Sequence, residues 1–379
     1  MTQPIDFSQR QNFPGVEGNQ FDIILKVAAR IQSIPTPIFA ILLFLWAALI
    51  TWANWPAALA IYLFFVSDWI LLGLLPRFKL SYGPAKPPTL ILALLRGIGL
   101  LLPQPLVFPA QLVGTALVLY GFYMEPHRVH LTHLKLHSNK IHAGQPIRIL
   151  HLGDLHLERE TRREKELQKM VTDLAPDLIL FSGDVLNLSY LKDPDAWQAA
   201  RHVLQQWQAP FGVYLVTGSP AVDLPEIMPD LLRDLPLTWL KDERVSVDIR
   251  GDKLDLIGLT CTHLPHEDLP RLEKLVARPS GNYTILLYHS PDLAPGAANL
   301  EIDMQLSGHT HGGQVRLPWI GSIFTGSLYG RKFQAGKYRL NNLLLYITRG
   351  IGMEGAGAPR VRFLCPPEII LWELSAPIE

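Results

Sequence analysis

The feature that most constrains this chain is a series of Asp and His residues that each follow a short apolar run. The runs and their endings are Ile147–Leu152 with Gly153-Asp154-Leu155-His156, Leu178–Phe181 with Ser182-Gly183-Asp184, Thr284–Tyr288 with His289, and Met304–Leu306 with Gly308-His309-Thr310-His311. Short apolar runs bounded by turn residues are typical of buried strands. Because α/β folds place their sites just beyond strand ends, we expect these polar side chains to meet.

The remaining pattern of this region alternates between helices and strands. Helical spacing is seen for Leu167, Met170, Val171 and Leu174, and again for Trp197, Ala200, Leu204 and Trp207. Further strands are predicted at Gly212–Val216 and Glu368–Leu374, with a hairpin formed by Val245–Ile249 and Leu254–Leu259. We therefore predict an α/β domain over residues 147–379.

The side chains of the series have the chemistry of a metal site. Two imidazoles flanked by glycines, as in Gly308-His309-Thr310-His311-Gly312, are poor core material. Asp154 and His156 would point the same way if the backbone there were extended. Carboxylates with imidazoles suit Mn, Fe or Zn ions better than Ca²⁺. Each motif is weak alone, and the ordered set is the evidence.

The series resembles the calcineurin-like metallophosphoesterase superfamily, and residues 147–374 look like its membrane-associated bacterial phosphodiesterase branch. The tail block from Thr348-Arg349-Gly350-Ile351-Gly352 to Pro366-Pro367-Glu368-Ile369 is similar to that branch too. The resemblance implies a four-layer α/β/β/α sandwich with two divalent metal ions that assist hydrolysis of a phosphate ester. It implies one ion held by Asp154, His156 and His311, a second by His289 and His309, and Asp184 bridging them.

One block departs from the family pattern. Gly218-Ser219-Pro220 stands where the family carries Gly-Asn-His, so Ser219 is a doubtful metal ligand and Pro220 occupies the expected general-acid position. Proline cannot shuttle a proton, and loss of a general acid costs about 10²–10⁴-fold in rate. We expect Asp223 to cap a helix near Pro225 instead of replacing the missing ligand.

Other polar residues have plainer interpretations. Cys261 and His263 are alternative replacements for the missing ligand, but we expect a buried thiol and a loop histidine. Neither Cys261 nor Cys365 has metal or redox spacing. Apolar residues interleave a histidine tract, which we interpret as a connector that begins a strand; its members are His127, His130, His133, His137 and His142. The sequence leaves two roles open for four cationic residues: contact with a substrate phosphate, or ordinary solvated charge. They are Arg316, Arg331, Lys332 and Arg349.

The N-terminal third predicts a transmembrane module. Hydrophobic residues make up 48% of the chain, and their excess lies in residues 36–125. The apolar segments, of which the one with Arg96 is the shortest, are Thr36–Trp52, Pro56–Leu75, Thr89–Leu102 and Gln104–Tyr123. Crossing ~30 Å of hydrocarbon takes about 20 residues, so we predict about four spanning helices.

Loop charges predict the orientation. Arg77, Lys79 and Lys86 lie between the second and third segments, whereas the loops around Asn54 and Gln104 have no Lys or Arg. The positive-inside rule then places the C-terminal domain in the cytoplasm of a multi-pass cell-membrane protein. If the Arg96 segment does not span, the domain faces outward.

Two shorter features complete the N-terminal organisation. We expect Asp68 and Arg96 to pair inside the membrane, because charges at that depth are rarely left alone. Residues 1–35 form an N-terminal segment with helical spacing that fits either an interfacial helix or a plain connecting helix. Residues 126–146 form the connector to the C-terminal domain.

Together these features predict a membrane-anchored, metal-dependent phosphoesterase. Its partners would be the lipid bilayer and a phosphorylated small molecule or lipid-linked substrate, cleaved at a phosphodiester or pyrophosphate bond. A formal net charge of zero gives no support for nucleic-acid binding. The alternative, favoured by Ser219-Pro220, is a weak or inactive relative that binds metal or a phosphorylated ligand as a sensor or scaffold.

Overall fold

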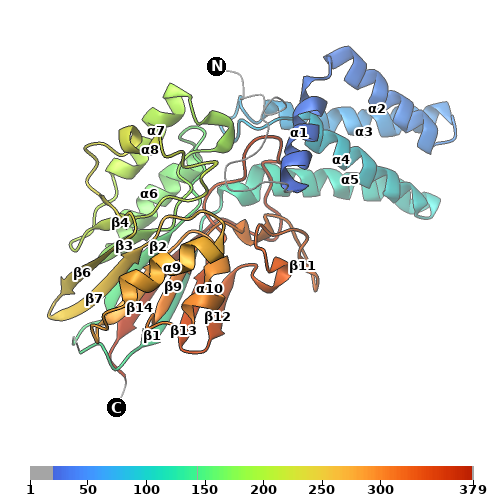
Figure 1. The fold of residues 1–379 in the computed structure, drawn as a ribbon. Coiled ribbons are helices and arrows are strands. Elements are labelled where there is room, and N and C mark those ends of the chain that lie inside the picture. The colour runs from blue at the N-terminus through green and yellow to red at the C-terminus, as the bar shows by residue number, and fades with distance from the viewer. Residues whose placement is uncertain (1–19, 143, 378–379) are drawn as a thin grey trace.

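Two six-stranded sheets form the C-terminal domain of the computed structural model, which describes residues 20–142 and 144–377 (Figure 1). The first sheet has the order β1 (His130–His137), β14 (Glu368–Ser375), β2 (Ile147–Leu152), β3 (Leu178–Phe181), β4 (Val213–Leu215) and β5 (Thr238–Trp239). The second has the order β12 (Gly336–Leu340), β13 (Leu343–Ile347), β9 (Met304–Ser307), β8 (Tyr283–Leu287), β7 (Asp252–Gly258) and β6 (Glu243–Ile249). Neighbouring strands from β2 to β5 are parallel, as are β7, β8, β9 and β13, so their carboxyl ends share an edge.

Helices cover the outer faces of both sheets. They are α6 (Arg162–Leu174), α7 (Pro194–Gln205), α8 (Met228–Leu231), α9 (Pro265–Val276) and α10 (Ala294–Ala297). Alternate residues of a strand point to opposite faces, so Leu150 and Ile179 pack toward α6 and α7 while Ile149 and Leu180 pack toward the second sheet. A third apolar cluster joins that sheet to α9 and α10. The predicted α/β sandwich is confirmed.

Local sequence explains where the helices begin. Thr161 and Glu164 form a capping box at the start of α6, and the Asp193 carboxylate accepts hydrogen bonds from the first amides of α7. These two helices match the predicted apolar spacing. The short strands β12 and β13, and the two-residue strands β5, β10 (Arg316–Leu317) and β11 (Gly321–Ser322), were not predicted.

The histidine tract runs into β1, as predicted for a connector that begins a strand. The residues of β1 are exposed or half-buried in near alternation, and β1 pairs with β14 in parallel. His133 lies 3.0 Å from Glu373, and His142 lies 3.3 Å from Asp252. Within the described part of the chain, none of the five tract histidines joins a group that could hold a metal ion.

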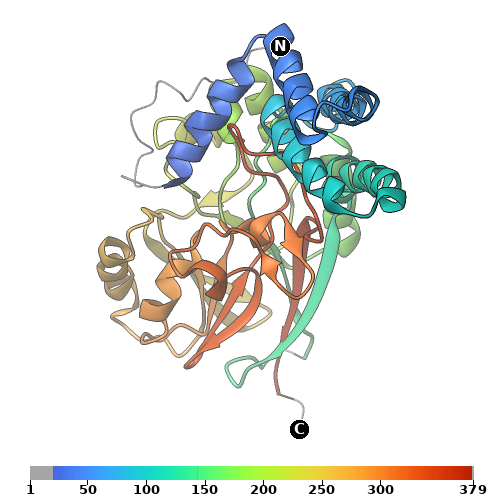
Figure 2. The ribbon, with the colours of Figure 1, turned by 90° about the vertical axis from the view of Figure 1, so that its right-hand side faces the viewer.

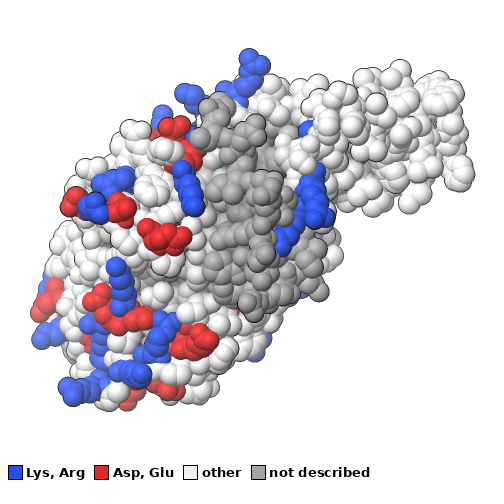
Figure 3. Space-filling view, turned by 45° about the horizontal axis from the view of Figure 1, so that its top comes forward, with Lys and Arg blue, Asp and Glu red and all other residues white. Residues whose placement is uncertain are grey.

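Four apolar helices project from the domain as an arm (Figures 1 and 2). They are α2 (Thr36–Ile50), α3 (Trp55–Leu74), α4 (Lys86–Ile98) and α5 (Gln104–Leu119), and α5 continues through a π-turn and a 3-10 turn to His127. Figure 3 shows an arm surface without charged side chains, whereas Lys and Arg side chains gather where it joins the domain. This distribution agrees with the predicted loop charges.

Only part of the arm has the length of a membrane span. Trp55–Leu74 and Gln104–His127 are long and apolar enough to cross, and a third span exists if the two helices bent by 105° at Ser33–Thr36 count as one. The 13 residues of α4 rise about 20 Å, which is short of ~30 Å. The expectation of about four full-length spans is therefore supported for two helices.

The predicted pairing of Asp68 with Arg96 is confirmed. The Arg96 guanidinium donates to both Asp68 carboxylate oxygens at 2.6 and 2.7 Å, which is a bidentate ion pair between α3 and α4. It also donates to the Gln111 carbonyl and the Thr115 hydroxyl of α5. One buried cation therefore links three helices of the arm.

The first helix, α1 (Gln20–Ser33), packs on the C-terminal domain. Leu25 belongs to the apolar cluster shared with α6 and α7, and Ala28 is packed so closely on Gly357 that a side chain at 357 would collide with it. These contacts favour the connecting helix over the interfacial one. Residues 1–19 of the predicted N-terminal segment lie outside the described residues.

Replacing Arg96 with Met should destabilise the arm, because it leaves the Asp68 carboxylate buried and unpaired. Such losses cost about 3–5 kcal/mol, whereas apolar replacement of both partners is often neutral. The free energy of unfolding of the full chain in detergent should therefore fall for Arg96→Met and largely recover in Asp68→Leu/Arg96→Met. Equal losses in the single and double variants would contradict this role.

Candidate metal centre

The six predicted ligands lie together beyond the ends of four strands. Asp154 and His156 follow β2 and Asp184 follows β3 in the first sheet, whereas His289 follows β8 and His309 and His311 follow β9 in the second. The centre therefore lies where the edges of the two sheets meet. Sequence reasoning placed each of these residues at a strand end, and the structure brings all six together.

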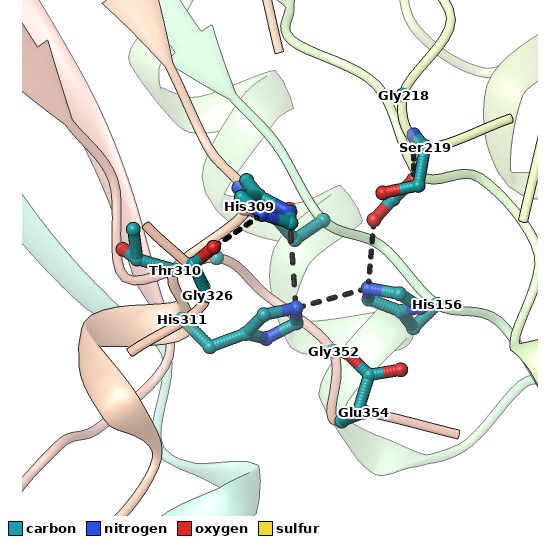
Figure 4. Close-up of polar contacts among 12 residues, drawn as sticks. His156, Gly218, Ser219, His309, Thr310, His311, Gly326, Gly352 and Glu354 are labelled. Carbon is teal, nitrogen blue, oxygen red and sulfur yellow. Dashed lines mark hydrogen bonds and ion pairs between the residues drawn. The ribbon is translucent and has the colours of Figure 1, made fainter. Parts of the chain in front are cut away.

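Four of them form one buried group. One ligand atom from each of Asp154, His156, Asp184 and His311 lies within 4.8 Å of the others. Figure 4 shows the imidazoles of His156 and His311 pointing toward one another, with their Nε2 atoms 3.0 Å apart. This is the group that the resemblance assigned to the first ion and its bridge.

A second group consists of His263, His289 and His309. Asp184 connects the groups, because its Oδ2 lies 3.3 Å from His156 Nε2 and 3.2 Å from His289 Nε2. A single carboxylate oxygen thus faces an imidazole from each group. This is the placement expected of a bridging ligand.

The donor atoms fit metal ions better than they fit each other. Asp154 Oδ2 is buried and has no hydrogen-bond partner among the described residues, and the Nε2 atoms of His156 and His311 face each other at 3.0 Å. Buried polar atoms are nearly always satisfied. Two imidazole nitrogens directed at each other beside two carboxylates are the donor set of a borderline divalent cation.

The backbone at the centre differs from the prediction. Asp154 and His156 have φ values of 50° and 40°, so this segment is left-handed and not extended, although both side chains still reach the same group. Asp184, His309 and His311 are also left-handed, with φ of 62°, 71° and 51°. Each such residue costs about 1–3 kcal/mol and persists where the surroundings enforce it.

Close backbone approach explains two glycines of the motifs. A side chain at Gly308 would collide with the Asp154 carboxylate, and one at Gly218 would collide with that of Asp184. The tail block presses on the same region, because the buried Arg362 guanidinium donates to the Gly350 carbonyl at 3.1 Å and Gly350 packs on Asp154. That block therefore positions the first ligand of the series.

The block that departs from the family pattern, Gly218-Ser219-Pro220, lies beside the Asp184 carboxylate. The Ser219 amide donates to Asp184 Oδ1 at 2.7 Å, and the Ser219 hydroxyl lies 3.2 Å from His289 Nε2. The prediction for Asp223 was wrong, because α8 begins only at Met228 and Asp223 caps no helix. Its carboxylate instead accepts from the amides of Asp184, Val185 and Gly218, which holds the two loops together.

His263 lies in a loop, as predicted, but the structure also brings it to the second group of candidate ligands. Its Nε2 lies 3.0 Å from the Ser219 hydroxyl, and its ring centre lies 4.5 Å from that of His309, so it belongs to the centre. No periodicity marks this residue, and its position after the predicted strand Leu254–Leu259 was the available signal. Cys261 is buried and unpaired with another cysteine, as expected, and so is Cys365.

Other contacts are seen for the four cationic residues whose roles the sequence left open. The Arg349 guanidinium forms an ion pair with Glu368 at 3.1 Å. Arg331 donates to the Ile320 carbonyl, and the Lys332 ammonium lies over the Tyr329 ring. Arg316 pairs by its backbone with Ser322.

Burial and mutual charge set the protonation of the ligands. Burial raises the pKa of the Asp154 carboxyl to about 6 and lowers the pKa of His263 to about 4. Burial opposes ionisation of Asp184 too, but the His289 charge and hydrogen bonds from His156 and His289 hold its pKa well below the usual range. Burial likewise lowers the pKa of His309 and His311, which favours the neutral rings that ligate metals.

Comparison with known proteins agrees with this geometry. The sequence model of the family described as calcineurin-like phosphoesterase matches residues 147–313. The metallophosphoesterase YkuE of Bacillus subtilis is 30% identical over 267 residues, which cover 68% of this chain and 89% of YkuE. The chain therefore belongs to the calcineurin-like metallophosphoesterase family.

Two further relatives have named activities. The UDP-2,3-diacylglucosamine pyrophosphatase LpxG of Chlamydia trachomatis is 24% identical over 312 residues, covering 66% of this chain and 90% of LpxG. The phosphodiesterase YaeI of Escherichia coli is 26% identical over 266 residues, covering 67% of this chain and 92% of YaeI. With its family, the chain is a metal-dependent hydrolase of phosphoesters.

Metal affinity should rise with pH between 5 and 7. A ligand carboxyl must be ionised, and a pKa of about 6 for Asp154 leaves it mostly protonated at pH 5. At pH 5 the metal ion must displace that proton, so we expect an affinity about tenfold weaker at pH 5 than at pH 7. Calorimetric titration of the metal-free chain with Mn²⁺ measures this, and equal affinities at the two pH values would contradict it.

Proposed function

We propose that this protein is a membrane-anchored dinuclear phosphoesterase that hydrolyses a phosphodiester or pyrophosphate bond of a lipid-linked substrate. The observation that carries the proposal is the Asp184 Oδ2 atom, which lies 3.3 Å from His156 Nε2 and 3.2 Å from His289 Nε2. One oxygen shared by two imidazoles of different groups fits a pair of ions with a common ligand.

The residues of the centre divide between two ions of Mn, Fe or Zn. Asp154, His156 and His311 would hold the first, His289 and His309 the second, and Asp184 both. Bound there, the ions would lower the pKa of a water and neutralise charge on the phosphoryl oxygens. The chain itself excludes bulk water from the ligands, because Asp154, His156 and His289 are at most 1% exposed.

The presence of Ser219-Pro220 in place of the family's Asn-His favours substrates with particular leaving groups. Pro220 cannot supply a proton to the leaving oxygen, and Ser219 is engaged with His289 and His263. A bond whose leaving group needs no protonation, such as a pyrophosphate or an aryl ester, suffers least from this loss. This supports a pyrophosphate substrate over an alkyl phosphate.

Membrane anchoring is supported by the arm. α3, and α5 together with the turns that extend it to His127, have the length and composition of spans. The four helices run out and back so that α1 and the domain lie at the same end (Figure 1). Exposed Arg77, Lys79 and Arg128 lie at that end, and exposed Trp52 and Trp55 lie at the far end. This arrangement supports a cytoplasmic domain.

The substrate class is supported by tethering and by a relative. A site held at the bilayer favours substrates that are themselves lipids, and LpxG is named for a pyrophosphatase acting on a diacylated sugar nucleotide. A phosphorylated small molecule is the simpler alternative. Comparison of a lipid-linked diphosphate in mixed micelles with a soluble nucleotide diphosphate separates the two.

Asp184→Asn should abolish most turnover of bis-p-nitrophenyl phosphate by the purified full chain. Disturbing a partner of a metal ligand costs about 10–100-fold, so loss of the shared ligand should cost about 100-fold or more. Asp173→Asn, an equal change at an exposed position of α6, is the matched control. Metal analysis of each protein completes the experiment: two metals without turnover in the wild type would favour the sensor or scaffold.

A further inference from the structure

A histidine from the second sheet lies where the family block is missing its ligand. His263 follows β7, and its Nε2 lies 3.0 Å from the hydroxyl of Ser219, the residue at the expected Asn position. The same hydroxyl lies 3.2 Å from His289 Nε2. His263 thus reaches the place from which an asparagine at 219 would act.

The imidazole of His263 is directed at the second group of ligands. Its ligand atom and those of His289 and His309 lie within 4.8 Å of one another. The His263 ring centre lies 4.5 Å from that of His309 and 6.0 Å from that of His289. Three imidazoles therefore converge beside the shared Asp184 carboxylate.

The loop also holds His263 in a costly conformation. Its φ is 63°, the left-handed conformation that five of the six predicted ligands adopt. Flanking contacts enforce it: the Asp268 carboxylate accepts from the Thr262 amide at 3.0 Å and the Thr262 hydroxyl at 2.7 Å. An ordinary loop histidine needs no such support.

We propose that His263 is a ligand of the second metal ion and replaces the asparagine that Ser219 has lost. This inference rests on the proposed dinuclear function and deepens it. An imidazole binds borderline cations more strongly than an amide oxygen, so a second site with three imidazoles and one shared carboxylate favours Zn or Fe over Mn. With His263 as a ligand, the change from Asn to Ser219 does not reduce occupancy of the second metal site.

Metal content of the full chain in detergent tests this directly. The wild type should hold two Zn²⁺ ions per chain, and His263→Ala should lose one or bind it at least about tenfold more weakly. His263→Ala/Ser219→Asn should regain the second ion. His266→Ala, an exposed histidine three positions further along, is the matched control.

The Mn²⁺-loaded proteins add a spectroscopic signature. Spin-coupled ions in the wild type and His266→Ala should give way to the signal of isolated Mn²⁺ in His263→Ala. His263→Asn keeps an oxygen ligand and should retain coupling if His263→Ala fails to fold. Two coupled ions in a folded His263→Ala would overturn the assignment. A folded His263→Asn that binds the second Zn²⁺ ion as tightly as the wild type would also overturn it, because an amide oxygen binds this ion more weakly than an imidazole. Turnover that persists in these variants would leave the proposed function standing.

A separate observation concerns an apolar surface beside the metal centre. The loop around β10 and β11 exposes large hydrophobic side chains, and its members are Leu317, Trp319, Ile320, Ile323, Phe324 and Leu328. We call residues 317–328 the apolar loop. Soluble proteins rarely expose so many large apolar side chains in one place.

The apolar loop connects the arm side of the domain with the metal centre. β11 lies at the side of the domain from which the arm projects, and it faces the same way as the arm in the turned view (Figures 1 and 2). The Gly326 carbonyl within the loop lies 3.0 Å from His309 Nε2 (Figure 4). Whatever covers this loop therefore lies next to a metal ligand.

The charge around the loop identifies its partner. From Met304 to Met353 the sequence has no Asp or Glu, and its cationic residues are Arg316, Arg331, Lys332, Lys337, Arg339 and Arg349. Exposed Arg77, Phe78 and Lys79 lie in the loop between α3 and α4 at the base of the arm. The Asp292 carboxylate, which accepts from the Ser327 hydroxyl and the Leu328 amide, is buried. Large exposed apolar side chains flanked by exposed cations suit an anionic lipid surface.

We propose that the apolar loop dips into the interface of an anionic bilayer and holds the metal centre at the level of the lipid headgroups. The inference rests on membrane anchoring by α3 and α5. Trp319 and Ile323 would enter the headgroup and acyl boundary, and the neighbouring cations would meet lipid phosphates. A lipid-linked diphosphate could then reach His309 while its acyl chains stay in the bilayer.

Spin labels measure this immersion in the full chain. Both native cysteines are buried, so a cysteine introduced at an exposed position takes the label selectively. The labelled positions are Ile323→Cys in the loop, Leu63→Cys at a 57% exposed site in α3, and Lys169→Cys on the exposed face of α6. Nanodiscs of equal phosphatidylcholine and phosphatidylglycerol supply the bilayer.

The label at Ile323 should collide more with oxygen than with a water-soluble nickel complex, as at Leu63, and the label at Lys169 should show the reverse. A loop label that behaves like Lys169 would overturn the docking proposal alone. Shielding from both reagents would also overturn it and indicate a protein partner, such as a second copy. A water-exposed label at Leu63 would overturn the membrane anchoring itself.

Discussion

The Asp184 carboxylate is the group on which the rest of the centre depends. One oxygen faces His156 from the first sheet and His289 from the second, and the other accepts the Ser219 amide. Its backbone is left-handed and is held by Asp223, which also fixes the loop after β4. The metal centre therefore exists only when both sheets are docked, because neither sheet supplies a full ligand set.

The Ser219-Pro220 departure from the family pattern must be considered together with the second sheet. In sequence it is a loss from the first sheet, but in space the second sheet offers His263 at the same place. A centre built from two sheets allows a residue of one sheet to take the place of a ligand lost from the other, because ligation depends on position in space and not on order along the chain. We identify no replacement for the proton donor missing at Pro220 among the described residues, and under the proposed function this loss favours bonds with good leaving groups.

The arm is joined firmly to the domain that carries the centre. Arg96 ties α3, α4 and α5 together, and the loop before α4 is fixed where the Tyr82 amide donates to Glu158 at 2.9 Å. Arg360 pairs with the same Glu158 at 2.7 Å, and the Tyr190 hydroxyl donates to the Tyr82 carbonyl. A bilayer that held the arm would therefore also set the orientation of the ligands and of the apolar loop.

The sequence alone determined the alternating strands and helices, the six candidate ligands at strand ends and the Asp68–Arg96 pair, because each is encoded by local periodicity, by a motif or by the cost of a buried charge. Tertiary structure decided what local patterns do not encode. His263 meets Ser219 across 44 residues, Asp223 binds loops instead of capping a helix, and α4 ends short of a full span. Each depends on how separate segments dock, and docking is governed by the packing of whole sheets and helices.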